Sequence, residues 1–254
     1  MAPTLQRVSR LIGLAGVFLW AFVEYAAGIA WRRDLSARAR CQTQWLHRQC
    51  CRVAKLIHLR IRIRGRSDTA PLLACNHTGY LDIVALGAAT PTRFVAKSEV
   101  RSWPCFGWLA RCGGTIFIQR RHRRSALLTG HYLRMAAQHN TRVAIFPEAT
   151  STDGRSVLPF HSSLLAVAAE ESWPVSPVWI SYELVEGDPA REVCWWGNMT
   201  LLPHLWRLLG HKEIWVHIHF GRVLRHWDRK TLAAELQLAV RDMAERRRCA
   251  PVTV

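Results

Sequence analysis

A chain of 254 residues, half of them apolar, is long enough for one large α/β domain or two small ones with a sizeable core. Its formal net charge of +17 favours an acidic partner, and because the arginines are scattered among apolar residues and twelve tryptophans, a membrane surface is favoured over nucleic acid. The eight cysteines form no C-x-x-C pair and no zinc-type cluster with histidine, which argues against a structural metal and favours reduced thiols in a protein facing the cytosol.

The first predicted element is an apolar segment, residues 11–31, which has arginines on both sides. Its length suits a membrane span, but Glu24 within it is costly in hydrocarbon, so a helix that lies in the interface, re-enters the membrane or packs on another helix is also open. A basic helix is expected over 34–55. Because arginines are denser after the apolar segment than before it, the positive-inside bias places the bulk of the protein on the cytoplasmic face of the inner membrane. We therefore expect a membrane-seated helical unit over 1–55 and one catalytic-sized domain over 56–254.

From residue 56 onward, short apolar or alternating segments predict strands, and longer segments between them predict helices. The strands are expected at 56–65, 71–75, 92–97, 114–119, 142–147, 175–183 and 213–221, and the helices at 80–89, 104–111, 123–139, 160–171 and 229–247. This alternation predicts an α/β domain with a mixed, largely parallel sheet of about seven strands flanked by helices. Pro177 predicts that the sixth strand runs near an edge or at a bulge.

The segment CNHTGYLD, residues 75–82, places a histidine five positions before an aspartate. On a regular helix the side chains of His77 and Asp82 would point about 140° apart, and on a strand they would lie on opposite faces. They can meet only if His77 precedes a helix and Asp82 lies in its first turns, and Gly79 permits the turn between them. The segment is therefore either an ordinary loop into a helix or a histidine paired with a carboxylate.

Two later segments also place polar residues at the ends of predicted strands. The strand at 114–119 follows a Gly-Gly pair and runs into Arg120 and Arg121. The strand at 142–147 ends on a proline, with Glu148 just beyond its carboxyl end. Ligands of open α/β sheets bind at those carboxyl ends, so these residues are candidates for a binding site.

Four segments, in this order and spacing, resemble the motifs of the glycerolipid (lysophospholipid) acyltransferases. The family's N-H-x-x-x-x-D motif is matched by Asn76, His77 and Asp82, its G-x-x-F/I-I-x-R strand by Gly114, Phe117, Ile118 and Arg120, its F-P-E-G-T-R-S motif by Phe146, Pro147, Glu148 and Thr150, and its V-x-P-V strand by Val175, Pro177 and Val178. The resemblance covers about residues 55–225. A lone H-x-x-x-x-D would be a weak signal, whereas four ordered motifs in strand contexts are a strong one.

The resemblance implies an enzyme that moves a fatty acyl chain from acyl-CoA or acyl-acyl carrier protein to the free hydroxyl of a lysolipid, with no metal and no cofactor. His77 would act as the general base on the lipid hydroxyl, and Asp82 would hold the other ring nitrogen and stabilise the imidazolium. Residues implied in substrate binding are Asn76, Gly114, Arg120, Glu148 and Thr150, of which Arg120 and Glu148 would lie at the headgroup. The expected partners are membrane lipids, the lysolipid acceptor and the acyl donor, and not nucleic acid.

The third motif departs from the family pattern at two positions. Ala149 replaces the usual glycine, which raises the question whether a positive φ is used there. Ser151 replaces the usual arginine and so removes one expected contact to a phosphate, for which nearby arginines at 121, 123, 124 and 155 could compensate.

The motifs favour 1-acyl-sn-glycerol 3-phosphate as the acceptor, which would give phosphatidate. Lyso-ornithine lipid is the alternative, because the segments FPEATSTDGRSVLPFHSSL and WWGNMTLLPH resemble the bacterial subgroup that acylates it. An alternative of a different class is a non-catalytic lipid-binding membrane protein on the same scaffold, against which the intact His77 and Asp82 argue.

Overall fold

The computed structural model describes residues 3–66, 70–119 and 123–249, and their side chains except at 3, 123–129 and 248–249. The α-helices are α1 (Pro3–Gly28), α2 (Leu35–Leu56), α3 (Leu81–Ala89), α4 (Phe106–Cys112), α5 (Arg123–Gln138), α6 (Ala166–Glu170), α7 (Pro189–Glu192), α8 (Leu201–Leu208) and α9 (Arg229–Cys249), with 3-10 turns at Ser98–Ser102 and Ser162–Leu165. The strands are β1 (Leu59–Arg64), β2 (Leu72–Cys75), β3 (Arg93–Lys97), β4 (Ile116–Ile118), β5 (Val143–Ile145), β6 (Val175–Leu184) and β7 (Ile214–Phe220).

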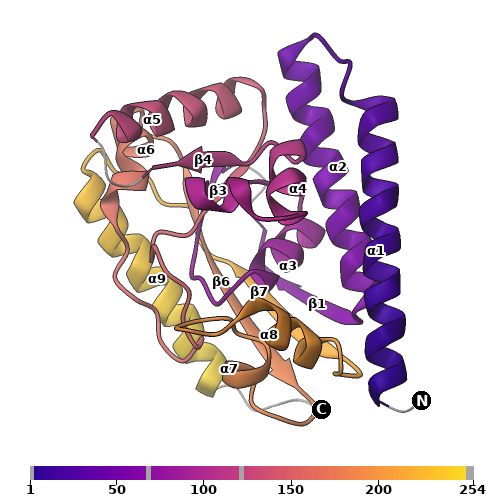
Figure 1. The fold of residues 1–254 in the computed structure, drawn as a ribbon. Helices are drawn as coiled ribbons and strands as arrows, with labels where there is room; N and C mark the ends of the chain where they lie inside the picture. The colour runs from indigo at the N-terminus through magenta and orange to yellow at the C-terminus, as the bar shows by residue number, and fades with distance from the viewer. Residues whose placement is uncertain (1–2, 67–69, 120–122, 250–254) are drawn as a thin grey trace.

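The strands form one seven-stranded sheet in the order β1-β7-β6-β2-β5-β3-β4 (Figure 1). Every neighbouring pair is parallel except β6 and β7, which are antiparallel. The prediction of a mixed, largely parallel sheet flanked by helices is confirmed. Because β2 and β5 lie side by side in parallel, the two polar segments that follow them meet at the same edge of the sheet.

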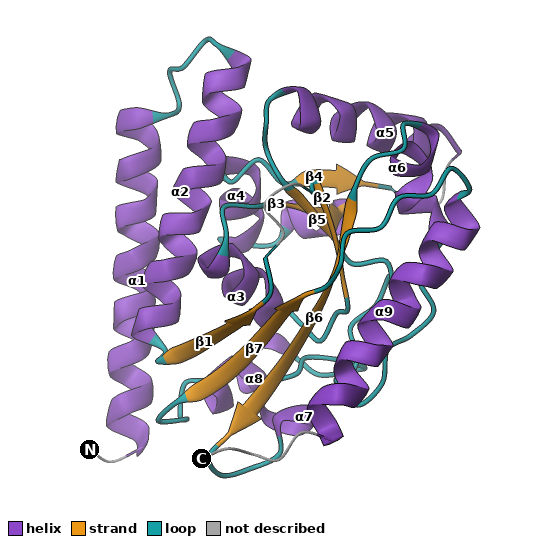
Figure 2. Ribbon diagram, turned by 180° about the vertical axis from the view of Figure 1, so that it is seen from behind, coloured by secondary structure: helices purple, strands orange, loops and turns teal. Residues whose placement is uncertain are grey.

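Helices cover both faces of the sheet and define two apolar cores (Figure 2). One core lies between the sheet and the layer formed by α1, α2, α3 and α8, and it includes Trp45, Leu86 and Phe146. The other lies between the sheet and α5, α6 and α9, and it includes Ile145 and Leu236. Strand β2 is buried along its whole length because it sits between both cores, so it provides a rigid support for the residues that follow it.

Strand β6 lies inside the sheet between β7 and β2, so the first alternative predicted for Pro177, a strand near an edge, was wrong. The second alternative, a bulge, agrees with the pairing around Pro177, because Val178 lies opposite Phe220 and Val175 opposite Leu224, which leaves one extra residue on the partner side. The proline is tolerated because the pairing of β6 with β7 begins at Val178, opposite Phe220, and Pro177 lies just outside that ladder. Beyond the ladder, the backbone N–H of Gly221 donates to the carbonyl of Pro177 at 2.8 Å. A proline can therefore occupy an interior strand where one neighbouring strand has already ended.

The N-terminal helices α1 and α2 lie side by side at the edge of the sheet that ends in β1 (Figure 2). Glu24 on α1 forms ion pairs with Arg48 and Arg52 on α2, at 2.7 and 2.6 Å. The indole N–H of Trp45 donates to the carbonyl of Ala21 at 3.2 Å. Residues 4–28 make the one described helix whose length and apolar composition would allow it to cross a membrane.

Candidate active site

The segment between β2 and α3 brings the predicted histidine and carboxylate together. β2 ends at Cys75, the chain turns, and α3 begins at Leu81, so Asp82 lies in the first turn of the helix. The turn requires Gly79, because a Cβ there would lie 2.9 Å from the backbone nitrogen of Trp195. As a result, Nδ1 of His77 lies 2.8 Å from Oδ2 of Asp82.

Asp82 is a fully buried carboxylate with hydrogen-bond donors on both oxygens. Oδ2 accepts from His77 and from the backbone N–H groups of Thr78 and Gly79, at 2.7 and 3.1 Å. Oδ1 accepts from the hydroxyl of Thr78 at 2.7 Å and from the hydroxyl of Tyr182 at 2.9 Å. Donors in these numbers stabilise an ionised carboxylate without contact to water.

The imidazole of His77 is held between a fixed carboxylate and an aromatic ring. Its face stacks on Phe146, which follows β5, with the ring centroids 4.2 Å apart. The side chain keeps 23% of its surface exposed, and Nε2 has no hydrogen bond to any described residue. With Nδ1–H donating to Asp82, Nε2 is an acceptor that can take a proton from a molecule arriving from outside.

Glu148 lies behind His77 and is 2% exposed. Its Oε1 accepts the backbone N–H of His77 at 3.1 Å, whereas its Oε2 is buried without a hydrogen bond to a described residue. Burial raises the pKa of Glu148 to about 8, against the opposing effect of hydrogen bonds from the backbones of His77 and Leu158. The adjoining Ala149 has a φ of 65°, so the positive φ is used here although the glycine is missing.

Asn76 holds two strands together through its side chain. Its amide N–H donates to the carbonyl of Ile180 at 2.9 Å, and its amide oxygen accepts the N–H of Ile180 at 2.7 Å. The side chain thus extends the β2–β6 pairing by one more residue. Both polar atoms of the amide have backbone partners on β6, so the structure gives Asn76 a supporting position rather than an open one.

The other predicted binding residues lie at varying distances from this arrangement. Gly114 has a φ of 71°, and its carbonyl accepts from the guanidinium of Arg93 at 2.7 Å, in the turn before β4. Thr150 is exposed on the loop after Glu148. Arg120 lies outside the described residues. The same loop is tied to the first motif at Thr152, whose N–H donates to the carbonyl of His77 at 2.9 Å.

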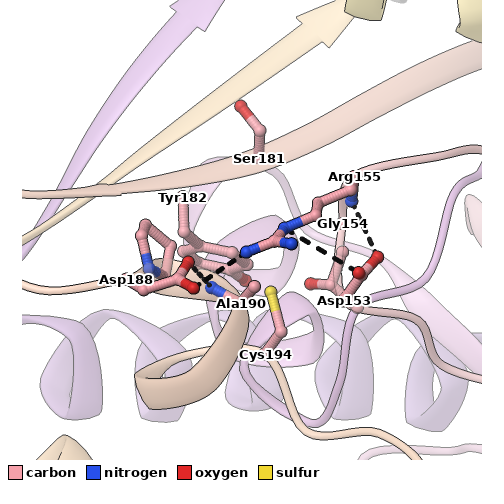
Figure 3. Close-up of a pocket in the computed structure, with 10 residues that line it drawn as sticks. Asp153, Gly154, Arg155, Ser181, Tyr182, Asp188, Ala190 and Cys194 are labelled. Carbon is pink, nitrogen blue, oxygen red and sulfur yellow. Dashed lines mark hydrogen bonds and ion pairs between the residues drawn. The ribbon is translucent and has the colours of Figure 1, made fainter.

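A pocket of about 180 Å³ is lined in part by Tyr182 (Figure 3), whose hydroxyl bonds the buried carboxylate of Asp82. Its lining residues are Thr78, Asp153, Gly154, Arg155, Ser181, Tyr182, Asp188, Pro189, Ala190 and Cys194. Arg155 and Asp188 form an ion pair at 2.9 Å at the rim. The pocket reaches the partners of Asp82 through Tyr182 and Thr78, and His77 does not line it.

Two buried thiols lie close to Asp82. Burial raises the pKa of Cys75 well above the usual range and that of Cys194 to about 12, and the charge of Asp82 adds to both effects. Both are therefore neutral at physiological pH and poor nucleophiles.

Sequence reasoning missed the two hydroxyls on Oδ1 of Asp82. Thr78 stands inside the first motif, where its type and its position before a helix could have indicated a hydrogen bond to the helix. Tyr182 comes from a strand 100 residues further along the chain. Nothing in its spacing marks it, because the register between β2 and β6 decides where its side chain ends.

The amino-acid sequence is similar to those of known acyltransferases. Residues 60–181 match the family model described as Acyltransferase. The chain is 38% identical over 244 residues to the lyso-ornithine lipid O-acyltransferase of Pseudomonas aeruginosa, a match that covers 93% of this chain and 92% of that protein. It is 34% identical over 221 residues to the lyso-ornithine lipid O-acyltransferase of Rhizobium meliloti, covering 79% of this chain and 75% of the relative.

More distant similarity extends to enzymes with a different acceptor. The chain is 32% identical over 149 residues to the 1-acyl-sn-glycerol-3-phosphate acyltransferase of Neisseria meningitidis, which covers 59% of this chain and 58% of that one. Among solved structures, the 1-acyl-sn-glycerophosphate acyltransferase of Thermotoga maritima superposes with a TM-score of 0.67 over 96% of this chain and 98% of that chain, at 17% identity. At that identity the superposition establishes a common fold.

Proposed function

Because this chain belongs to the acyltransferase family, we propose that it transfers a fatty acyl chain from a thioester to the free hydroxyl of a lysolipid, with His77 as the general base. The observation that carries this proposal is the 2.8 Å hydrogen bond between Nδ1 of His77 and Asp82, which leaves Nε2 without a partner among the described residues on a side chain that is 23% exposed. A lipid hydroxyl is a poor nucleophile until a base takes its proton, and a histidine held by a carboxylate is suited to that task.

The reaction needs no nucleophile from the protein. The hydroxyl oxygen bonds to the thioester carbonyl carbon while its proton passes to Nε2 of His77. The negative charge of Asp82 stabilises the imidazolium that forms. The tetrahedral intermediate then expels the thiolate, which takes the proton from the imidazolium, so the products are an ester and a free thiol. The residues assigned to these steps require no metal or other cofactor.

The acceptor that the described residues suit best is a lyso-ornithine lipid, whose headgroup carries an ammonium as well as a carboxylate. Ser151 stands where the family's usual arginine would contact a phosphate. The relatives matched over most of their length carry the same acceptor in their names. This order of preference is the reverse of the one that the motifs favoured.

1-Acyl-sn-glycerol 3-phosphate is the second candidate. The match of Gly114 and Arg120 to the second family motif supports it, since an arginine at that position could bind a phosphate. The similarity to the Neisseria enzyme supports it too. For either acceptor the donor is acyl-CoA or acyl-acyl carrier protein, both of which are acidic and would be attracted by a net charge of +17.

Helix α1 seats the protein on the cytoplasmic face of the inner membrane, in the interface rather than across it. Arg10 is 5% exposed and donates to the carbonyls of Leu209 at 2.9 Å and Lys212 at 3.2 Å. Glu24, about 21 Å further along the helix, pairs with α2. A helix fastened to the rest of the protein at two such distant points cannot cross a bilayer without taking that protein with it. Its outward face is apolar and suits burial among lipid headgroups and chain ends.

The acceptor assignment is tested with purified protein in detergent or lipid vesicles. One acyl thioester is supplied with lyso-ornithine lipid or with 1-acyl-sn-glycerol 3-phosphate, and both thiol release and the product lipid are measured. We expect kcat/KM for lyso-ornithine lipid to be higher by about tenfold or more, the scale on which a polar headgroup contact discriminates. A preference for the phosphate acceptor would reverse the assignment. Failure to release thiol with any lysolipid, while lipid is bound, would favour the non-catalytic alternative.

A further inference from the structure

The carboxylate of Asp82 receives one donor that its own loop does not supply. Four of its five hydrogen bonds come from residues 77–79, which precede it directly. The fifth comes from the hydroxyl of Tyr182 on β6, which donates to Oδ1 at 2.9 Å. Oδ1 is the oxygen that does not contact His77. The tyrosine therefore acts on the far side of the carboxylate from the imidazole.

We propose that Tyr182 is a positioning residue for the acyl transfer, because its hydroxyl fixes the plane of the Asp82 carboxylate so that Oδ2 faces Nδ1 of His77. The same hydrogen bond draws negative charge toward Oδ1, which moderates how strongly Oδ2 holds the imidazolium. Tyr182 thus sets both the orientation and the proton affinity of the base without touching the substrate. The inference rests on the proposed role of His77 as the general base.

The placement of Tyr182 is rigid for reasons visible in the sheet. The amide of Asn76 bonds both backbone groups of Ile180, two residues before Tyr182. Because side chains two apart on a strand share a face, this contact directs Tyr182 toward the face on which α3 and Asp82 lie. On its other side Tyr182 pairs in register with Val216 of β7. The first motif is in this way connected to β6, the strand that carries the fourth motif, through one amide and one phenol.

The phenol remains a donor over the working pH range. Burial raises the pKa of Tyr182 well above the usual range, and the charge of Asp82 raises it further. The other titratable groups next to Asp82 are the thiols of Cys75 and Cys194, whose raised pKa values also keep them neutral. Glu148 accepts the backbone N–H of His77 and has a pKa of about 8. It is the one neighbouring group in the described site that could change charge near neutral pH.

The test is Tyr182→Phe, which keeps the ring that lines the pocket in Figure 3 and removes only the hydroxyl. We expect kcat to fall by about tenfold to a hundredfold, the scale of a hydrogen bond to a charged group, and KM to change by less than about twofold. Without the phenol hydroxyl, more of the negative charge of Asp82 lies on Oδ2, which should then hold the imidazolium of His77 more strongly. The acid limb of the kcat profile should therefore move to higher pH by about half to one unit.

Tyr80→Phe is the matched control. It also removes one partly buried phenol close to the site, but that hydroxyl bonds Nδ1 of His204 at 2.9 Å and does not contact Asp82. The acid limb of the kcat profile of Tyr80→Phe should lie at the same pH as in the wild-type protein. Glu148→Gln is then added to the wild type and to Tyr182→Phe. The difference in the acid limb between these two proteins should persist, which excludes Glu148 as the group that titrates.

A kcat profile that falls in height without moving along the pH axis would overturn the proposal, since that result indicates a merely structural tyrosine. If Tyr182→Phe does not fold, Thr78→Val takes its place, because it removes the other hydroxyl on Oδ1 and should move the limb in the same direction. An unmoved limb in that variant would overturn the proposal equally. The role of His77 is judged separately by His77→Ala, so the two claims fail independently.

Discussion

Glu148 is a carboxylic acid held where water does not reach it. Its Oε1 accepts a hydrogen bond from the backbone N–H of His77. Burial raises the pKa of the Glu148 carboxyl group to about 8. At pH 7 the neutral form therefore predominates. A neutral Glu148 both accepts and donates hydrogen bonds, and this combination fits a site that must bind a hydroxyl next to a histidine base.

This ionisation predicts a pH dependence of stability. The pKa of Glu148 is about 8 in the folded protein, against 4.5 for an ordinary glutamate, so the folded state binds the proton more tightly. The contribution of Glu148 to the free energy of unfolding is fully present below pH 4.5 and is lost as the pH rises toward 8. Relative to Glu148→Gln, the melting temperature of the wild-type protein should fall across that interval.

The measurement is thermal unfolding in detergent at a series of pH values, with Glu186→Gln as the control for the loss of an exposed carboxylate. The glutamine keeps the oxygen that accepts from His77, so the difference isolates the ionisation. A constant difference between wild type and Glu148→Gln from pH 4.5 to 8 would contradict the raised pKa.

Residue-scale prediction from sequence succeeds where the contact is local. The offset between His77 and Asp82 allows one geometry only, a turn followed by a helix, and that geometry is present. It fails for Tyr182 and for the amide of Asn76, because their partners lie about 100 residues away and are fixed by strand register. The positive φ at Ala149 could not be decided either, since alanine disfavours it and only the surrounding turn imposes it.

At the scale of elements, α1 combines a polar side that is fastened to the protein with an apolar side that is exposed. Ile12 and Leu19 are each 68% exposed, and because they are seven residues apart they lie on the same face of the helix. Arg10 and Glu24, by contrast, have partners within the protein. This division explains how charged residues such as Arg10 and Glu24 occur in a segment apolar enough to enter a membrane.

The double substitution Ile12→Lys and Leu19→Lys should weaken binding to vesicles by about a hundredfold. Each apolar side chain contributes about 1.5 kcal/mol or more when it enters the bilayer, and two together give about 3 kcal/mol. The measurement is co-flotation with vesicles that contain anionic phospholipid. Leu238→Lys is the control, because it makes the same change at a residue that is 59% exposed on α9. Equal binding of all three proteins would show that α1 is not the membrane seat.

Several elements were predictable and a few were not. The strong helical or alternating patterns of 34–55, 229–247 and 213–221 correspond to α2, α9 and β7 within a few residues. Helices α7 and α8 were missed, since they are short: α7 has four residues and α8 has eight, although Asp188 and Thr200 precede them and Pro189 opens α7. The apolar pattern also located α1 too late, because residues 3–10 carry polar side chains such as Arg7 and Arg10 but are still helical.

At the scale of the whole molecule, the strand order brings the motifs together. The strands that carry the first, third and fourth motifs, β2, β5 and β6, are adjacent in the sheet although they are separated along the chain. The second motif lies on β4, at the far edge of the sheet. Alternating strands and helices predicted the class of fold, but the strand order and the single antiparallel pair are tertiary properties that no local pattern encodes.

The central claim is that His77 is the base of an acyl transfer, and His77→Ala tests it most directly. The variant is assayed for thiol release with an acyl thioester and lyso-ornithine lipid, beside the wild type and His131→Ala, which removes an exposed histidine on α5. General-base catalysis typically contributes ~10²–10⁴, so turnover should fall by at least about a hundredfold while melting temperature and vesicle binding stay at the wild-type level. A folded, membrane-bound His77→Ala that keeps more than about a tenth of the wild-type rate would contradict the claim.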